Sequence, residues 1–378
     1  MKQIIIITFA SFMLFGCAKK PEPTDSQSTL KVDTRVEKFG ETSLMVDNFS
    51  SLSRWKEENY EEVLTLFIKS CQKPQVKKLY ENTCRDAPNA TNAKTFLHQE
   101  FLPYKIMSEK SASHGLLTGY YEPYIKASLQ KKGKFIYPIY RKPKDLITVE
   151  LASVYPELKH LRLRGRLVGD KLVPYHTRAM SEKYPLDAEV LCYTDSKIDR
   201  FFLEIQGSGK VLLDNKKTMF VGFENQNGHK YRAIGKYLVT IGALRLEEVS
   251  LQSIRSWLEK NPSRVDEVLN YNESMVFFQQ RTQGATGALG VELTPKRSVA
   301  VDRRFIPLGS MLYVDARFRE KNLSKVVFAQ DTGGAIKGAL RADLFLGSGE
   351  EALDIAGHLK APLQVWILLP RERELAKI

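Results

Sequence analysis

Short apolar runs separated by turn residues constrain the fold of this 378-residue chain more than any other feature of its sequence. They begin near residue 114 and are rich in Val, Ile, Phe and Tyr, with Gly and Pro between them. Such runs are typical of short β-strands joined by turns. The expected strands are SHGLLTGYYEPYI at 113–125, KFIYPIY at 134–140, RFFLEI at 200–205, KVLL at 210–213, TMFVG at 218–222, MVFFQ at 275–279, SVAVD at 298–302, MLYVD at 311–315, KVVFAQD at 325–331 and LQVWILL at 363–369. We therefore predict a fold that is mainly β with accessory helices, in two β-rich domains.

Helical periodicity appears between these runs. Apolar residues recur at helical spacing, and Ser, Asp and Gly stand at the expected ends. The expected helices are 51–68, 231–241 ending before Gly242, one beginning at Ser250, one beginning at Ser263 with Asp266 completing a capping box, and one capped by Ser348 with Glu351 three residues on.

The first residues resemble an export signal. The apolar run at 4–15 is too short to span a bilayer and is followed by Gly16 and Cys17. This layout resembles a bacterial lipobox, with 1–16 as the signal peptide and 17–45 as a tether lipidated on Cys17. We therefore predict a periplasmic protein anchored by lipid to the outer membrane; the alternative is a plain cleaved signal with a nearby cysteine.

Three further cysteines leave two interpretations open. In an oxidising compartment Cys71 and Cys84 could form a disulfide across a short loop, which would leave Cys192 unpaired. Alternatively, all three are small buried hydrophobic residues.

Several classes of function lack support in the sequence. The formal charge of +13 favours an anionic partner, but no run of five basic residues indicates nucleic-acid binding. The six histidines show no metal-binding spacing, residues 207–210 lack the spacer of a P-loop, and no GxSxG elbow occurs. We therefore expect neither a metal nor another cofactor.

Three aspartates are the candidate chemical groups. Asp302 and Asp331 each end an apolar strand, and Asp343 lies between Ala342 and Leu344. Apolar neighbours favour the neutral form of a carboxyl, as a general acid near neutral pH requires. The alternative is that they are turn or capping residues, or partners of nearby cations. The cations concerned are Arg303, Arg304, Lys337 and Arg341.

The triplet from Asp331 to Gly333 also resembles the active-site triplet of aspartic peptidases. The second copy that a single-chain peptidase needs is absent, because residues 194–196 read Thr-Asp-Ser. A lone triplet is weak evidence.

Aromatic and amide groups suit a sugar ligand, with stacking faces and hydrogen bonds along an open groove. Core packing is the alternative for at least half of them. The candidates are Tyr120, Tyr121, Gln206, Gly207, Ser208, Gly209, Phe277 and Phe278.

Together these residues resemble a known family. The motifs are GYYEP at 119–123, FFLEIQGSG at 201–209, GHKYRAIGK at 228–236, VFFQ at 276–279, AVDRRFIPLGS at 300–310 and DTGGAIKGALRADLFLGSG at 331–349. In this order, over about residues 115–369, they resemble the membrane-bound lytic murein transglycosylase A family. The C-terminal part resembles its three-aspartate domain, with Asp302, Asp331 and Asp343.

The resemblance implies a fold and roles for residues. A double-psi β-barrel would form from 46–122 and 275–378, with a second β-barrel domain at 123–274 and a glycan groove between them. The catalytic aspartate would be Asp343, with Asp331 beside it. Asp302 would be a structural or tuning residue, while Gly333 and Lys337 would join the substrate-binding set. The chain departs from the family's pattern at Glu122, Glu204 and Thr332.

The resemblance also implies an activity. Such enzymes cut the β-1,4 bond between N-acetylmuramic acid and N-acetylglucosamine in peptidoglycan and leave a 1,6-anhydro end. The expected partners are glycan strands and outer-membrane lipid, and a monomer is expected. Two alternatives stay open: a water-using muramidase with two carboxylates, and a non-catalytic peptidoglycan-binding lipoprotein.

Overall fold

A computed structural model describes residues 36–39, 42–107, 115–158, 161 and 163–371. They all belong to one compact unit that starts at Thr34. The predicted signal peptide and the lipidation site at Cys17 lie outside the described residues. Within the described ranges, no helix has the length and apolar character needed to cross a bilayer.

The largest sheet has ten strands, in the order β1-β2-β3-β19-β4-β18-β14-β17-β15-β16. Its strands are β1 Val36–Phe39, β2 Thr42–Val46, β3 Phe101–Met107, β4 Gly115–Glu122, β14 Ser298–Val301, β15 Met311–Phe318, β16 Lys321–Asn322, β17 Lys325–Asp331, β18 Arg341–Ser348 and β19 Lys360–Pro370. Strand β19 also pairs with β15, so the pairings from β19 through β4, β18, β14, β17 and β15 return to β19. This closed run agrees with a barrel, but the double-psi crossover stays a prediction.

A second sheet has six strands, in the order β13-β12-β11-β5-β10-β6. The strands are β5 Tyr124–Ser128, β6 Tyr137–Tyr140, β10 Val190–Thr194, β11 Ser208–Leu213, β12 Thr218–Gln226 and β13 Val276–Arg281. Because β13 pairs with β12, this sheet continues past residue 274, where the sequence analysis ended the inserted domain. The order is open, so a second closed barrel stays a prediction.

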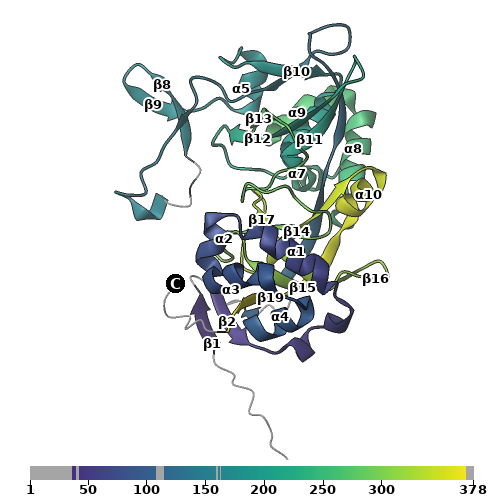
Figure 1. Cartoon of the computed structure of the whole chain (residues 1–378). Helices are drawn as coiled ribbons and strands as arrows, with labels where there is room; N and C mark the ends of the chain where they lie inside the picture. The colour runs from purple at the N-terminus through teal and green to yellow at the C-terminus, as the bar shows by residue number, and fades with distance from the viewer. Residues whose placement is uncertain (1–35, 40–41, 108–114, 159–160, 162, 372–378) are drawn as a thin grey trace, which may run out of the picture. The chain divides into compact units, whose positions relative to one another are not determined.

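A third sheet has three short strands, of which β8 and β9 are labelled in Figure 1. Its strands are β7 Ile147–Thr148, β8 Arg164–Val168 and β9 Lys171–Pro174.

Four N-terminal helices pack on the ten-stranded sheet (Figure 1). They are α1 Tyr60–Ser70, α2 Pro74–Leu79, α3 Glu81–Asp86 and α4 Ala93–Glu100. Asn59 and Asn92 cap α1 and α4 with their side chains, as N-cap residues do. A disulfide joins Cys71, at the end of α1, to Cys84 in α3. Cys192 is a buried free thiol, so the first of the two cysteine interpretations is confirmed.

The remaining helices are α5 Arg178–Lys183, α6 Lys197–Gln206, α7 Ile234–Thr240, α8 Leu251–Lys260, α9 Val265–Tyr271 and α10 Glu350–His358. Helix α6 packs on strands of the six-stranded sheet, and α7, α8 and α9 share a hydrophobic cluster with it, while α10 packs on β4 and β18. Ser250 caps α8, as predicted from the sequence.

The predicted strand at 200–205 is wrong, because this segment lies in helix α6. The Ser196 side chain accepts a hydrogen bond from the Asp199 amide and so caps the first turn. At the other end Gly207 ends the helix with φ at 77°, a conformation that glycine adopts without strain. These two local signals make the segment a helix, because a short apolar run alone fits a helix and a strand equally well.

Four helix starts also differ from the sequence prediction, and one of them is α7, which begins at Ile234 rather than at Tyr231. The N-terminal helix begins at Tyr60 rather than near 51, after two turns of 3-10 helix. Helix α9 follows a 3-10 turn at Pro262–Arg264 and has no side-chain cap, so the predicted capping box is wrong. Ser348 ends strand β18 and Gly349 precedes α10, because Ser348 bonds side chains of the six-stranded sheet instead.

Candidate active site

The candidate site lies where β4 and β18 run side by side. The strands are parallel, and their register sets Thr118 opposite Asp343. The Thr118 hydroxyl donates a hydrogen bond of 2.5 Å to Oδ1 of Asp343. Nη2 of Arg341 in turn donates to Oγ1 of Thr118 over 2.8 Å. Because the guanidinium can only donate, it leaves the hydroxyl proton free to bond the Asp343 carboxyl.

The environment of Asp343 favours its protonated form. Burial raises the pKa of Asp343 to about 6, although the Thr118 hydrogen bond and the positive charge of Arg341 lower it again in part. The negative charge of Asp331 adds to the rise. A carboxyl with a pKa near 6 can give up a proton and take one back near neutral pH. The direction of this shift confirms what the apolar neighbours of Asp343 predicted.

Asp331 and Asp343 flank one residue of the strand between them. Strand β14 pairs with β17 on one side and with β18 on the other. Ala300 of β14 is opposite Asp331 in one pairing and opposite Asp343 in the other. Since neighbouring strands lie about 4.8 Å apart, the two backbone positions are roughly 10 Å apart. Two aspartates that are twelve positions apart in sequence thus lie on either side of a single strand.

Three donors hold the Asp331 carboxylate. The Tyr120 hydroxyl donates to Oδ2 over 2.9 Å. The backbone N–H groups of Ala288 and Thr332 donate to Oδ1 over 3.0 and 2.8 Å. Burial raises the pKa of Tyr120 well above its ordinary value, and the neighbouring carboxylates of Asp331 and Asp343 add to the rise, so this phenol stays a donor. Asp331 is therefore oriented by fixed groups and differs in its surroundings from Asp343.

Asp302 is an ion-paired carboxylate at the end of β14. Its side chain is 4% exposed, and Arg304 donates to it, with 2.6 Å from Nη2 to Oδ2. The Gly338 amide donates to the same oxygen over 2.9 Å. Burial opposes ionisation here, but the hydrogen bonds from Arg304 and Gly338 outweigh it and lower the pKa of Asp302 to about 2. An always-ionised carboxylate suits a role in holding the turn.

A small depression beside Asp302 brings two predicted substrate contacts together. Its lining includes Asp302, Thr332, Gly333 and Lys337. These come from the segments after β14 and β17, which end at Val301 and Asp331. The sequence prediction that Gly333 and Lys337 contact substrate stays a prediction.

The QGSG stretch links the two large sheets. Oε1 of Gln206 accepts a hydrogen bond of 3.1 Å from the Tyr121 amide and so ties α6 to β4. Gly207 forms the left-handed end of α6, and Ser208 begins β11. A Cβ atom added to Gly209 would clash with the side chain of Leu203 and would touch the backbone of Pro123, the residue that follows β4.

The two phenylalanines predicted to stack on a sugar are core residues. Phe277 is 0% exposed and Phe278 is 1% exposed. Neither ring offers a face to a ligand in this structure, because β13 packs both into hydrophobic clusters. Tyr120 and Tyr121 are also buried, at 8% and 5% exposure. The core-packing alternative thus describes these four rings.

Sequence reasoning missed Thr118 and gave Arg341 only the role of a possible ion-pair partner. A threonine in a strand carries no signal of its own. The available signal was its position two residues before Tyr120, since alternate residues of a strand share a face.

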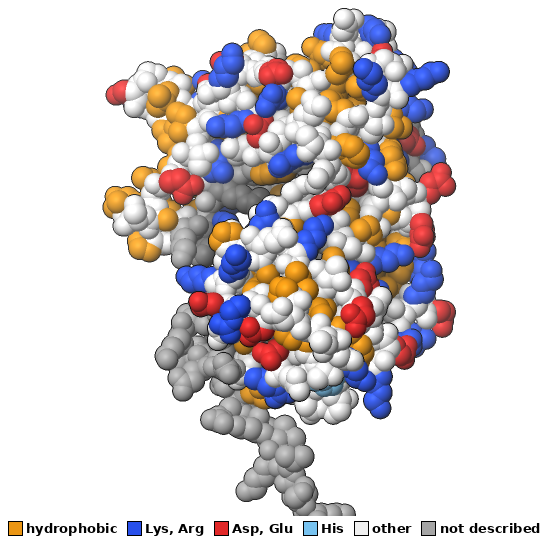
Figure 2. Space-filling model, viewed as in Figure 1, with side chains coloured by type: hydrophobic (Ala, Val, Ile, Leu, Met, Phe, Trp, Pro, Cys, Tyr) orange, Lys and Arg blue, Asp and Glu red, His pale blue; other side chains and the backbone are white. Residues whose placement is uncertain are grey.

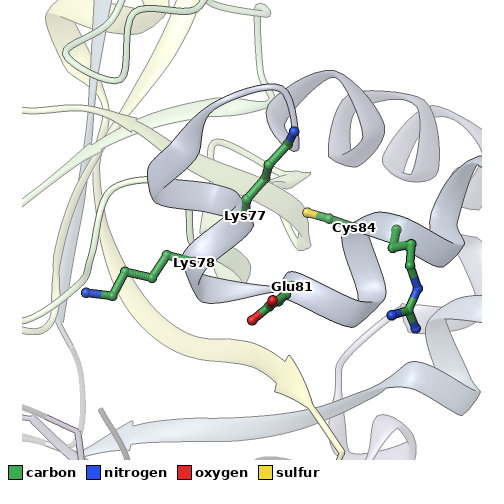
Figure 3. A pocket seen from close by; sticks show the side chains of 5 residues that line it. Lys77, Lys78, Glu81 and Cys84 are labelled. Carbon is green, nitrogen blue, oxygen red and sulfur yellow. The ribbon is translucent and has the colours of Figure 1, made fainter.

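Another depression lies elsewhere and contains none of these groups. It is lined by Lys77, Lys78, Glu81, Cys84 and Arg85, around the disulfide between α1 and α3. In Figure 3 the amino groups of Lys77 and Lys78 point away from one another. Its side chains therefore do not converge on a ligand.

Neither a cluster of charged side chains nor a set of metal ligands marks another candidate site among the described residues. Lys and Arg side chains are spread over the face shown in Figure 2, with Asp and Glu among them. No group of three or more His, Cys, Asp or Glu residues within the described ranges is placed to hold a metal ion.

Comparisons with known proteins add to this geometry. The model of the MltA specific insert domain matches residues 116–279, and that of the 3D domain matches residues 297–369. Membrane-bound lytic murein transglycosylase A of Escherichia coli K12 is 35% identical over 261 residues, which cover 66% of this chain and 64% of that protein. The match thus spans a little less than two thirds of that relative.

Solved structures resemble the chain over more of its length. The monoclinic crystal structure of MltA from Neisseria gonorrhoeae has a TM-score of 0.76 and 31% identity, covering 90% of this chain and 97% of that one. E. coli MltA with bound chitohexaose has a TM-score of 0.64 and 27% identity, covering 83% and 90%.

Proposed function

This chain belongs to the MltA family of membrane-bound lytic murein transglycosylases, and from that premise we propose that it cleaves peptidoglycan glycan strands with Asp343 as its single acid and base. The bond cut is the β-1,4 bond between N-acetylmuramic acid and N-acetylglucosamine. The product carries a 1,6-anhydromuramic acid end. The observation that carries the proposal is the Asp343 carboxyl, held by Thr118 and with its pKa raised to about 6.

In the first half of the reaction, protonated Asp343 donates its proton to the glycosidic oxygen as the bond to C1 breaks. Positive charge develops on the sugar ring, as in other glycosidic cleavages. The elevated pKa supports this step, because the acid is neutral in part of the population near neutral pH.

In the second half, the same carboxylate takes the proton from the C6 hydroxyl of the muramyl sugar, whose oxygen bonds C1. The nucleophile belongs to the substrate, so proximity replaces an activated water. The proton gained by Asp343 restores the starting state. One carboxyl therefore serves both halves of the reaction.

Asp331 acts on this group at a distance. Its negative charge raises the pKa of Asp343, and its own position is fixed by Tyr120 and two backbone amides. Asp302 holds the turn at the end of β14 through Arg304 and Gly338. The glycan strand lies across the face that β4 and β18 form, between the ten-stranded sheet and the six-stranded sheet.

Analysis of the soluble products from purified sacculi by mass spectrometry tests the activity. We expect anhydromuropeptides from the wild-type chain and none above background from Asp343→Asn. Asp170→Asn is the matched control, because Asp170 lies exposed in the turn between β8 and β9. Products heavier by one water per cleavage would instead identify a muramidase. Binding to sacculi without any soluble product would identify a non-catalytic wall-binding protein.

We propose in addition that Cys17 carries lipid and anchors the chain to the outer membrane. The relatives' name, membrane-bound, and the short apolar segment before Gly16 support this proposal. Export of wild type and Cys17→Ala, followed by fractionation, tests it. Wild type is expected in the outer-membrane fraction and the variant outside it; equal fractionation of the two would contradict lipid anchoring.

A further inference from the structure

The hairpin formed by β8 and β9 ends in apolar side chains that are open to solvent. Leu167 is 60% exposed, Val168 48% and Leu172 47%, and we call these three residues the apolar tip. None of them belongs to a hydrophobic cluster of the described residues. Figure 2 shows hydrophobic side chains at the surface over the region where Figure 1 labels β8 and β9. Single exposed apolar residues are ordinary, but neighbouring ones indicate a contact surface.

The base of this hairpin is held by hydrogen bonding and close packing. Nε of Arg164, the first residue of β8, donates a hydrogen bond of 2.8 Å to Oδ1 of Asn225 in β12. A Cβ atom added to Gly228, just after β12, would clash with the side chain of Arg164, so the two segments pack closely. The apolar tip is therefore at the far end of a hairpin whose base is fixed.

The register of the hairpin puts apolar side chains on both of its faces. Leu167 pairs with Leu172, and Val168 pairs with Lys171. Because neighbouring residues of a strand point to opposite faces, the two leucines share one face and Val168 lies on the other. A protein partner would cover one face and would need about 800 Å² of it. A fluid apolar phase, such as the boundary between lipid headgroups and acyl chains, can surround both faces at once.

Positive charge accompanies the apolar tip. Residues 159–171 contain five Lys or Arg residues and one acid, Asp170. Within the described hairpin, Lys171 is exposed, and Arg166 comes one position before Leu167. Long cationic side chains can bury their methylene groups while the charge reaches a headgroup phosphate. This combination of apolar and cationic side chains is complementary to a phospholipid surface with anionic headgroups.

We propose that the apolar tip is a membrane contact, which inserts at the boundary between the headgroups and the acyl chains of an anionic phospholipid surface. Lys171 and Arg166 bind headgroup phosphates there. A contact of this kind is weak and reversible by itself, because only a few side chains leave the water. It adds a second attachment to the acyl chain proposed on Cys17, and it does not depend on the proposed cleavage reaction.

Flotation with lipid vesicles tests the contact on a chain that begins at Ala18. This chain lacks the apolar run and Cys17, but it contains the whole compact unit that starts at Thr34. We expect it to bind vesicles of phosphatidylethanolamine with phosphatidylglycerol, and to bind vesicles of phosphatidylcholine alone about tenfold less. Raising the salt concentration should weaken binding to the anionic vesicles, because salt screens the charges.

Substitutions separate the apolar and the charged parts of the contact. Leu167→Ser/Leu172→Ser should lower the partition coefficient on anionic vesicles at least about tenfold, because two leucines no longer leave the water. Lys171→Gln should lower it about fivefold on anionic vesicles and leave it unchanged on neutral ones. Leu167→Trp keeps an apolar side chain in the apolar tip and should bind at least as tightly as the unsubstituted chain.

Matched controls lie away from the apolar tip. Val154→Ser/Tyr155→Ser removes two side chains that are 68% and 51% exposed in the loop between β7 and β8, at the end of β8 opposite the turn. Lys131→Gln removes an exposed lysine between β5 and β6. Both control variants should bind vesicles as the unsubstituted chain does. The melting temperature of every variant, and its activity on purified sacculi, should equal those of the unsubstituted chain.

Each outcome supports or overturns the membrane contact. Loss of binding to anionic vesicles in the tip variants, with the controls unchanged, supports it. Absence of binding by the unsubstituted chain, or equal loss in tip and control variants, overturns it. The proposal also fails if light scattering shows that Leu167→Ser/Leu172→Ser turns a dimer into a monomer while vesicle binding is unchanged, because the apolar tip then joins two copies of the chain. Missing activity on sacculi would count against the proposed function alone, because vesicle binding is measured without substrate.

Discussion

Thr118 donates its hydroxyl proton to Asp343 while it accepts a hydrogen bond from Arg341. The two strands that bring Thr118 and Asp343 together are 225 residues apart in sequence at this pair. Both the hydrogen bond and the cation behind it stabilise the charged form of Asp343, against a burial that favours the neutral form. The pKa of about 6 is the balance of these opposing effects.

Removal of the Thr118 hydroxyl should raise the pKa of Asp343. Thr118→Val keeps the shape of the side chain but no longer donates to the carboxylate. The activity that depends on protonated Asp343 should then persist to higher pH, with the falling limb of kcat/KM displaced upward by about one unit. The pH profile on purified glycan strands measures this. Thr118→Ser keeps the hydroxyl and should retain the wild-type profile; the same displacement in both variants would contradict the assignment.

Removal of the Asp331 charge should have the opposite effect. Asp331→Asn keeps the size of the side chain but no longer repels a negative charge on Asp343, so the pKa of Asp343 should fall. The falling limb of kcat/KM should therefore move to lower pH, with some activity left at its optimum. Complete loss of activity at every pH would show that Asp331 takes part in the chemistry, as the two-carboxylate muramidase requires.

The Cys71–Cys84 disulfide should stabilise the fold without acting in catalysis. It closes a loop with a sequence separation of 13, for which the loss of chain entropy in the unfolded state is worth about 3 kcal/mol. Reduction of wild type should lower the free energy of unfolding by about that amount in urea titrations. Cys71→Ser/Cys84→Ser should start at the lower value and not respond to reductant. An unchanged wild-type midpoint, with both thiols trapped, would contradict this.

Local sequence predicted some features of the site well. The apolar neighbours of Asp343 were enough to predict the direction of its pKa shift, because burial is the largest cause. Most strands after residue 275 were also found, since each is a run of apolar residues between turns. These features depend on residues within a few positions of one another.

Features that depend on distant segments were not predictable in the same way. The bond from Thr118 to Asp343 needs the parallel pairing of β4 with β18, and no residue near Thr118 encodes it. Helix α6 was missed because its apolar run also suits a strand, while its buried Glu204 is satisfied by Arg178 from α5. Ser348 looked like a helix cap, but its contacts with Tyr124 and Lys210 arise only once the two sheets are in place.

The acid that the reaction needs should reduce the stability of the fold at neutral pH. Burial raises the pKa of Asp343 from 3.8 to about 6, so the native state binds this proton more tightly than the unfolded chain does. The contribution of this group to the free energy of unfolding is therefore fully present below about pH 4. It is lost as the pH rises through about 6, and the loss reaches about 3 kcal/mol. The side chain in Asp343→Asn stays neutral. The free energy of unfolding of this variant should therefore be about 1–3 kcal/mol higher than that of wild type at pH 7.5, with little difference at pH 4.

Asp302→Asn is the control of opposite sign. The pKa of Asp302 is lowered to about 2, so its charge stabilises the native state above about pH 4, and this stability is lost as the pH falls toward 2. The variant should therefore lose about 2 kcal/mol at pH 7.5. Urea titrations of wild type and both variants at the two pH values measure these differences. If Asp343→Asn were less stable than wild type at pH 7.5, the carboxylate would be a favourable part of the fold, and its selection as a proton donor would lose its physical basis.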